Sequence, residues 1–482
     1  MSVALLGAPR AVEAQATPDK IAAPAPIKGG GLTITGSVRS RFENWDWFDA
    51  PGFDDRYNFG AALMRVGIGQ QHKKVDWLVE GQLSLLLGLP DQAIAPAPQG
   101  QLGQGASYFA ANGRQDAGAF PKQVYVRFKA LGGDKASSVR VGRFEFADGA
   151  EVTPKNSTLA ALKREHVAHR LISNFGFTHV QRSFDGVHYA RQTPNNNVTV
   201  MAARPTEGVF QLRGMKELDV DLYYGALTRQ LPWKNAESEA RAFVSYYHDG
   251  RNTLKVDNRS SALRTADRRS IRLTTVGGHY LSAVKTGMGD VDLLLWGVGQ
   301  MGSWGALDHR ASAIAAEAGY QPTLRLKPWF RAGYFRGSGD SDATDARHGT
   351  FFQMLPTARL YARFPFYNLM NNEDRFAQIT LRPQSRVTLR TEAHQLRLSN
   401  AADLWYSGGG AFQETTFGYA GRPSNGNNSL ATMLDASIDY EYSAKNSFTF
   451  YLAGALGRGV TSAIYPAGKN ARLTYAEFTR RF

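Results

Sequence analysis

The chain of 482 residues contains no cysteine, and this absence excludes several kinds of chemistry together. Disulfides, thiolate metal sites and cysteine nucleophiles cannot form without it. A chain without thiols also crosses an oxidising periplasm without the risk of mispaired disulfides. The composition therefore favours an exported protein, although a cytosolic chain can lack cysteine by chance.

Long apolar runs are missing as well. The most hydrophobic stretches, such as Leu83–Leu89 and Val291–Val298, are far shorter than the roughly 20 apolar residues that a membrane-spanning helix needs. Mean hydropathy is only −0.35, which excludes a helical membrane protein. A transmembrane β-barrel stays compatible with this value, because half of each strand can face a polar lumen. No break in composition marks an interdomain linker.

The sequence does contain one theme, repeated from residue 32 onward. Segments of alternating apolar and polar residues are followed by turns rich in Gly, Asp, Asn or Pro. In 32–43, Ile34, Val38 and Phe42 share one face, while Arg39 and Arg41 share the other. Because side chains alternate across a strand, the first face fits lipid and the second fits water. The final segment, which ends at Phe482, has the form of a strand that closes a ring.

About 18 segments follow this pattern, and their lengths suit strands that cross a bilayer at a tilt. They are 32–43, 57–70, 75–87, 123–129, 137–146, 186–192, 197–203, 218–228, 240–248, 271–283, 289–299, 312–321, 324–335, 376–382, 386–398, 431–442, 447–456 and 471–482. The sequence therefore predicts an all-β fold, a transmembrane antiparallel β-barrel of about 18 strands over residues 32–482.

The connections between these segments are uneven in length. Tight turns such as 285–289 and 443–446 alternate with long loops, which is typical of outer-membrane barrels. The long loops are 88–121, 148–180, 249–269, 336–374 and 399–429. Residues 157–169 have helical spacing, so we expect a short helix there, either folded into the pore or lying on the surface of its loop.

The N-terminal residues differ from the rest. An apolar patch at Val3–Ala8 and the small-x-small pattern Ala14-Gln-Ala16 indicate that residues 1–16 are the remnant of a secretory signal. Residues 17–31 contain Pro18, Pro24, Pro26 and three glycines, so we expect a flexible segment.

The charge is strongly basic and dominated by arginine. Net charge is +14, and 16 lysines leave 40 of the 56 basic residues as arginine. Arginine binds carboxylates through a rigid fork of donors and stays charged at every relevant pH. Many arginines lie on the polar face of a strand, where they would raise the concentration of anions in the lumen. The pore-lining candidates are Arg39, Arg41, Arg65, Arg127, Arg331 and Arg390, with Glu392 beside the last.

Other uses of this charge stay open. The basic residues could hold phosphates of lipopolysaccharide or pair with acids in the loops. Acids such as Glu43, Asp76, Glu80 and Glu392 are expected to neutralise and orient individual arginines. Nucleic-acid binding fits poorly, because the charge is interleaved with lipid-facing strands.

Several segments resemble the alginate-export family of outer-membrane porins. They are 38–43, 141–145, 181–187, 337–345 and 349–356, in that order along the chain. The resemblance implies an 18-stranded monomeric barrel whose arginine-lined constriction conducts an anionic polyuronate outward and is occluded by a loop and a turn. Carried over by position, it assigns the constriction to Arg41, Arg65, Arg127, Arg143, Asp185 and Arg390. Strand alternation from Val139 and Val141, however, turns Arg143 outward unless a bulge intervenes.

Two further motifs are weighed and set aside. Asp340–Asp345 clusters three carboxylates but lacks the spacing of an EF-hand, so a solvated turn is favoured over a calcium site. His279 is assigned to the lipid face beside Leu273 and Leu281; a barrel phospholipase would need a serine and an acid next to it there. Nothing in the sequence fixes such a partner.

The sequence thus predicts a bacterial outer-membrane, anion-selective pore for an acidic polysaccharide, with no catalytic residues, metal or cofactor. A porin for small organic acids or anionic oligosaccharides is the alternative within the class; a barrel phospholipase and a surface receptor lie outside it. Expected partners are the anionic saccharide, outer-membrane lipid and lipopolysaccharide, and periplasmic secretion components. We expect a monomer that binds no nucleic acid.

Overall fold

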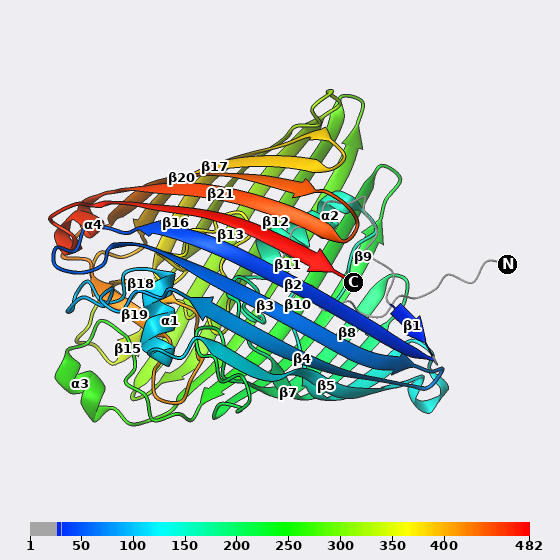
Figure 1. Cartoon of the computed structure of the whole chain (residues 1–482), viewed down its shortest axis with the longest axis horizontal. Helices are drawn as coiled ribbons and strands as arrows, with labels where there is room; N and C mark the ends of the chain where they lie inside the picture. Colours follow the sequence, from blue (N-terminus) through cyan, green and yellow to red (C-terminus); the bar gives the residue numbers. More distant parts are fainter. Residues whose placement is uncertain (1–26, 30) are drawn as a thin grey trace.

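The computed structural model describes residues 27–29 and 31–482, and its architecture is a closed ring of antiparallel strands (Figure 1). In this part of the chain no helix is long and apolar enough to cross a membrane. The ring within the described residues has 18 strands, as the sequence predicts. They are β2 (Leu32–Asp46), β3 (Arg56–Gln71), β4 (Val75–Leu87), β5 (Ala117–Lys129), β6 (Ser137–Phe144), β7 (Phe184–Gln192), β8 (Asn196–Pro205), β9 (Val220–Pro232), β10 (Ala236–Asp249), β11 (Ile271–Thr286), β12 (Gly289–Trp304), β13 (Leu307–Pro322), β14 (Trp329–Gly337), β16 (Asn372–Gln384), β17 (Val387–Leu398), β20 (Ser429–Glu441), β21 (Asn446–Gly457) and β22 (Asn470–Arg481).

The last strand closes the ring against the first. β22 pairs with β2 from Ser37↔Arg481 to Asp46↔Arg472. The backbone of Phe482 continues the ladder, exchanging hydrogen bonds of 2.8 and 2.9 Å with Gly36. Closure leaves no unpaired edge along this seam, which a lipid environment requires. The prediction for the final segment is confirmed.

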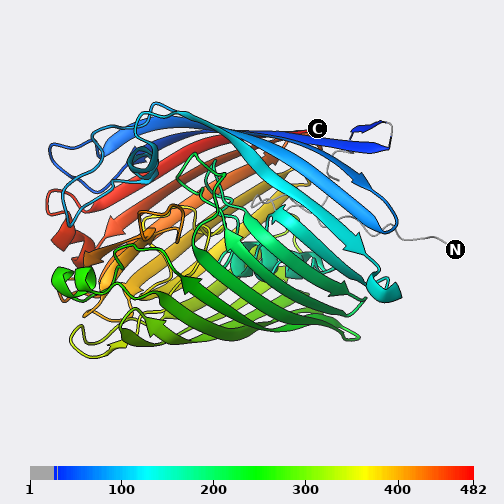
Figure 2. The same cartoon turned by 90° about the horizontal axis from the view of Figure 1, so that it is seen from below.

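The two ends of the barrel differ. Short turns such as 72–74, 193–195 and 385–386 lie at one end, together with the C-terminus and the short strand β1 (Ile27–Gly29). The long connections lie at the other end, with α1 (Gln104–Asn112), α3 (Ser261–Ala266) and α4 (Gly459–Ile464) (Figures 1 and 2). By the usual outer-membrane pattern the short-turn end is periplasmic and the long-loop end extracellular.

The N-terminal expectations stay predictions. Residues 1–16 lie outside the described residues, as do 17–26 and Gly30. The described residues Ile27–Gly29 form β1 and pair with Leu32–Ile34 of β2.

Two extracellular loops fold back into the barrel. We call residues 145–183 the plug loop and residues 338–371 the inner loop. The plug loop contains α2 (Ser157–Leu162), which a single wide turn of helix, Lys163–Val167, continues. Every residue from Glu165 to Phe184 is buried. The inner loop carries the two-residue strand β15 (Arg347–His348) and meets the plug loop at the bridge Ile172↔Leu355. A separate hairpin of β18 (Leu404–Gly408) and β19 (Tyr419–Pro423) belongs to loop 399–428.

Candidate functional site in the barrel lumen

The plug loop crosses the lumen from wall to wall. Its side chains or carbonyls contact inward-facing residues on strands from distant parts of the ring: Arg39 of β2, Glu239 of β10, Glu317 of β13 and Arg390 of β17. Only a segment inside the ring can reach all of these strands. The helix expected at residues 157–169 is therefore present and lies in the pore (Figure 1).

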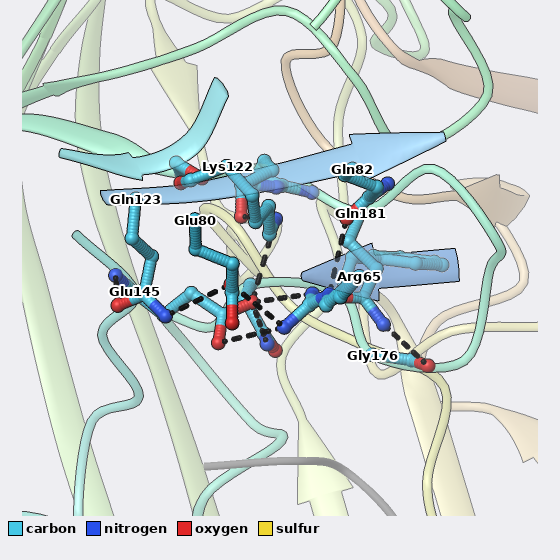
Figure 3. Close-up of polar contacts among 12 residues, drawn as sticks. Arg65, Glu80, Gln82, Lys122, Gln123, Glu145, Gly176 and Gln181 are labelled. Carbon is cyan, nitrogen blue, oxygen red and sulfur yellow. Dashed lines mark hydrogen bonds and ion pairs between the residues drawn. The ribbon is translucent and has the colours of Figure 1, made fainter. Parts of the chain in front are cut away.

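Arg65 of β3 is the centre of the first cluster, at the root of the plug loop. Its guanidinium lies 2.8 Å from the carboxylate of Glu145 and 3.6 Å from Glu80 on β4. Lys122, at a bulge in β5, lies 3.4 Å from the same Glu145 oxygen. Asn174, near the far end of the plug loop, donates to that oxygen at 2.9 Å. Figure 3 shows these side chains converging, so that both ends of the loop are held at one point.

The charge of Glu145 is stabilised by its neighbours. Burial by itself would raise the pKa of this carboxyl, but Arg65 and Lys122 outweigh burial and hold its pKa at about 2. Glu145 is therefore an anion throughout the physiological range. Removing Arg65 would take away its nearest cation, and a buried charge that loses its partner is strongly destabilising.

Arg390 of β17 holds the middle of the plug loop from another part of the wall. Its Nη2 lies 2.8 Å from Glu165, while Glu392 on the same strand lies 3.7 Å from its Nε. Burial would raise the pKa of Glu165, but Arg390 and Arg164 hold it well below its usual value. The lumen arginine on the wall thus binds a carboxylate that the plug supplies.

Glu317 of β13 makes the reciprocal arrangement, a wall carboxylate that binds a histidine and an arginine of the plug loop. It lies 2.7 Å from both His166 and Arg170 of the plug loop, and 2.9 Å from Arg331 of β14. Arg331 also pairs with Asp292 of β12. Plug and wall are therefore joined by interleaved charges rather than by a single salt bridge.

The periplasmic side of the plug carries a small cavity. Arg41 of β2 pairs with Glu477 at 2.7 Å and lies over the rings of Phe177 and Tyr475 at 4.5 and 4.6 Å. The cavity beside it has a volume of about 40 Å³, room for a few water molecules. Arg39 donates to the carbonyls of Gly176 and Thr178 in the plug loop. The plug loop is therefore bound to the wall at this level of the lumen.

The structure places most of the pore-lining candidates as strand alternation predicts. Arg39, Arg41, Arg65, Arg331, Arg390 and Glu392 are buried and face the interior, and Arg127 pairs there with Asp76. The expected acids are also in place, since Glu43 lies 3.3 Å from Arg41. Each of these arginines contacts a carboxylate of the wall or of the plug loop.

Arg143 and Asp185 were assigned to the constriction, and the structure places them elsewhere. They pair with each other at 2.6 Å, and Arg143 is cross-strand partner to Val124. Val124 is exposed on the outer face, as are Val141 and Val187 two residues away from the pair. No bulge reverses the alternation, so both side chains face outward. Arg143 instead donates to the carbonyls of Gly214 and Met215, and so fastens loop 206–219 to the wall.

His279 is also placed differently from the expectation. Its side chain faces the interior, where Nε2 lies 2.8 Å from Glu239, and Leu273 and Leu281 share this buried face. The nearby serines lie on the other face of the sheet from His279. There Ser238 and Ser282 contact each other, and Ser238 accepts a hydrogen bond from Tyr280. A serine, histidine and acid do not meet at this place, and the phospholipase arrangement is not formed.

Sequence reasoning missed the groups that the loops contribute. Glu145, Glu165 and Arg170 of the plug loop, and Arg363 of the inner loop, are all buried partners of wall residues. A loop carries no strand alternation from which to predict an inward direction. The available signal was the unusual number of charged residues beside the predicted helix, at Lys163-Arg164-Glu165-His166.

The Asp340–Asp345 segment forms turns rather than a cation site. Asp340 and Asp342 accept hydrogen bonds from the backbone amides of Asp342 and Thr344, each at 2.9 Å. Within residues 27–29 and 31–482, no group of three or more His, Asp or Glu side chains is arranged to hold a metal ion.

An 18-stranded closed barrel with an apolar outer face and a charged, loop-filled lumen defines a porin of the bacterial outer membrane. The chain belongs to the alginate export family, whose sequence model matches residues 115–452. No curated protein matches the sequence.

Solved porin structures share the fold at very low sequence identity. The structure of Pseudomonas aeruginosa OpdK with vanillate has a TM-score of 0.55 and 8% identity, covering 93% of this chain and 98% of that one. P. aeruginosa OccK2 (OpdF) has a TM-score of 0.56 and 8% identity, covering 94% and 97%. Acinetobacter baumannii OccAB4 has a TM-score of 0.52 and 8% identity, covering 93% and 98%. At this identity the likeness concerns the fold.

Proposed function

We propose that the protein is an anion-selective pore that passes an acidic oligo- or polysaccharide and is closed at rest by the plug loop. The observation that carries the proposal is the pairing of wall arginines with plug carboxylates. Arg65 binds Glu145 and Arg390 binds Glu165, each at 2.8 Å. A uronate carboxylate offers arginine the same two oxygens. The plug therefore occupies the positions that a substrate carboxylate would take.

Exchange of one carboxylate for another keeps the cost of opening low. If the plug loop left the lumen alone, Arg65 and Arg390 would exchange a carboxylate partner for water. A polyuronate entering as the plug withdraws replaces those partners one by one. Its repeating carboxylates suit a lumen whose arginines lie on several strands, among them β2, β3, β14 and β17.

The alternative substrate, a small organic acid, is favoured by one comparison. The neighbouring OpdK structure contains vanillate, a single carboxylate on an aromatic ring. Arg41 and the rings of Phe177 and Tyr475 are groups that suit such a molecule once the plug loop, which contributes Phe177, makes room beside them. The acidic polysaccharide and the small organic acid differ in length, so a test that compares a polymer with a monomeric acid distinguishes these two substrate classes.

The test is single-channel recording in planar bilayers under a salt gradient, with two backgrounds. In the first the plug loop is intact; in the second residues 145–176 are replaced by a short Gly-Ser linker, which removes both Glu145 and Glu165. We expect rare openings in the first, and an open, anion-selective channel in the second that polyuronate blocks and a neutral glucan does not. Replacing Arg65 and Arg390 by Gln in the open background should reduce anion selectivity. Equal permeability to both ions before and after the replacement would contradict the proposal, and block by a monomeric aromatic acid alone would favour the alternative.

A further inference from the structure

The outer face of the barrel has an uneven distribution of charge along its axis. Near the periplasmic end the outward residues are largely aromatic, including Phe128, Tyr320, Phe330, Tyr440 and Phe448. Near the extracellular end of β14, β16, β17 and β21 they are arginines: Arg336, Arg375, Arg397 and Arg458. Aromatic rings suit either membrane interface, but a cluster of arginines suits a surface rich in anions.

Strand register places these arginines close together. Arg336 is directly opposite Glu373, and Glu373 is directly opposite Arg397. Arg375 lies two residues from Glu373 on the same strand, beside Tyr334 and Gln395. Arg458 donates to Thr432, and Thr432 is opposite Gln395. Cross-strand neighbours are about 5 Å apart, so the four guanidiniums cover one compact area, which we call the arginine patch.

The patch has an excess of positive charge. Glu373 lies 3.5 Å from Arg336, whose side chain is 54% exposed. Among the residues that the structure describes, Arg375, Arg397 and Arg458 have no carboxylate within ion-pair distance. This contrasts with the lumen, where each arginine discussed above is paired. Such a surface repels a second copy of itself and attracts anions.

The height of the patch identifies where that anion lies. Ten residue steps separate Val387 from Arg397 on β17. They correspond to about 33 Å along a strand, or about 25 Å along the barrel axis at a tilt of about 40°. This is the height of the apolar band of an outer-membrane barrel. The arginine patch therefore lies at the level of the head groups of the outer leaflet.

On the periplasmic side of the patch the outer face is apolar and its side chains are small. Ala318, Ala332, Ala377 and Ala393 form one continuous cross-strand row over β13, β14, β16 and β17. The exposed side chain of Leu434 borders this row. The small side chains leave room for an acyl chain to lie against the wall beneath a head group that the arginines hold.

We propose that the arginine patch binds the phosphates of an acylated, phosphorylated glycolipid of the outer leaflet, the lipid portion of lipopolysaccharide. Arginine forks bind phosphate oxygens in pairs, and the alanine row receives the acyl chains. This surface is separate from the lumen and does not depend on what the pore conducts. It fixes the barrel at a defined height and contacts a particular lipid.

The test is native mass spectrometry of the folded full chain in detergent, with diphosphorylated lipid A, dephosphorylated lipid A or phosphatidylethanolamine added. One variant carries Arg375→Gln, Arg397→Gln and Arg458→Gln. Its charge-matched control carries Gln at Arg56, Arg191 and Arg310, which are surface arginines already paired with aspartates. We expect the patch variant to bind diphosphorylated lipid A about tenfold or more weakly, and the control to bind like the unaltered chain.

Equal binding by both variants, or equal retention of dephosphorylated lipid A, would overturn the proposal. Full displacement by millimolar inorganic phosphate would also overturn it, because the site would then be a simple anion site. If the triple Gln variant does not fold, the Arg→Lys triple variant keeps the charge and removes the fork. This variant should bind diphosphorylated lipid A more weakly than the unaltered chain, by a smaller factor than is expected of the Gln variant. Unchanged binding would again refute the inference.

Discussion

Glu165→Gln is the substitution that should release the plug loop with least change in shape. It removes the carboxylate that Arg390 binds at 2.8 Å while keeping the side-chain volume. Breaking a buried ion pair by removing one partner typically costs about 3–5 kcal/mol. Glu392, 3.7 Å from Arg390, retains part of the compensation. We therefore expect the plugged state to lose about 2 kcal/mol, which is about a 30-fold change in the ratio of plugged to open protein.

The assay is the open probability of single channels in planar bilayers, measured on protein whose folding is verified by heat-modifiable migration. The matched control is Glu414→Gln, which makes the same chemical change at a loop residue 3.5 Å from the exposed Lys216. The control should behave like the unaltered chain, because exposed ion pairs contribute little. An open probability for Glu165→Gln within threefold of the control would refute the role of the Arg390–Glu165 pair as a latch.

Three further predictions concern other parts of the barrel. Because the pKa of Glu145 is lowered to about 2, its contribution to plug docking is complete above about pH 4.5 and is lost as the pH falls toward 2. Open probability should not change through this group from pH 8 to 5 and should rise in more acidic buffer. Glu145→Gln should reduce that rise, and an unchanged acid response would contradict the role of Glu145. Arg143→Ala removes the hydrogen bonds to the carbonyls of Gly214 and Met215. Loop 206–219 should then be cleaved several-fold faster in limited proteolysis, while the ion selectivity of the pore stays the same. A change in ion selectivity would contradict the outward placement of Arg143. Gly36→Val should lower the melting temperature, since an added Cβ meets the ring of Phe482 at the closing seam and overpacking costs about 1–3 kcal/mol; an unchanged melting temperature would show that the ring moves aside freely.

Much of the barrel could be predicted because strand alternation is a local property of the sequence. Segments 32–43 and 386–398 match the observed β2 and β17 closely, and Arg39, Arg41 and Arg390 within them face the interior as their apolar neighbours require. A one-residue error in alternation would turn every side chain of a strand to the wrong face. The agreement at Arg39, Arg65 and Arg390 shows that the signal is strong where one face is apolar and the other charged.

β11 shows where this signal fails. Its buried face carries Leu273 and Leu281, while Val276 and Val284 are exposed on the other face. Both faces are apolar because the plug and inner loops fill the lumen with apolar side chains against this wall. Hydrophobicity therefore cannot distinguish the lipid face from the interior, and the assignment of His279 to the lipid face was wrong for this reason.

The sequence by itself determined the number of strands, their positions and the inward direction of most lumen arginines, since these depend on residues two apart in one segment. Only the tertiary structure decided which carboxylates those arginines bind. Glu145 and Glu165 lie in a loop, and their partners are on strands 80 and 225 residues away. No local pattern records such pairings, because they depend on how the plug loop folds within the closed ring.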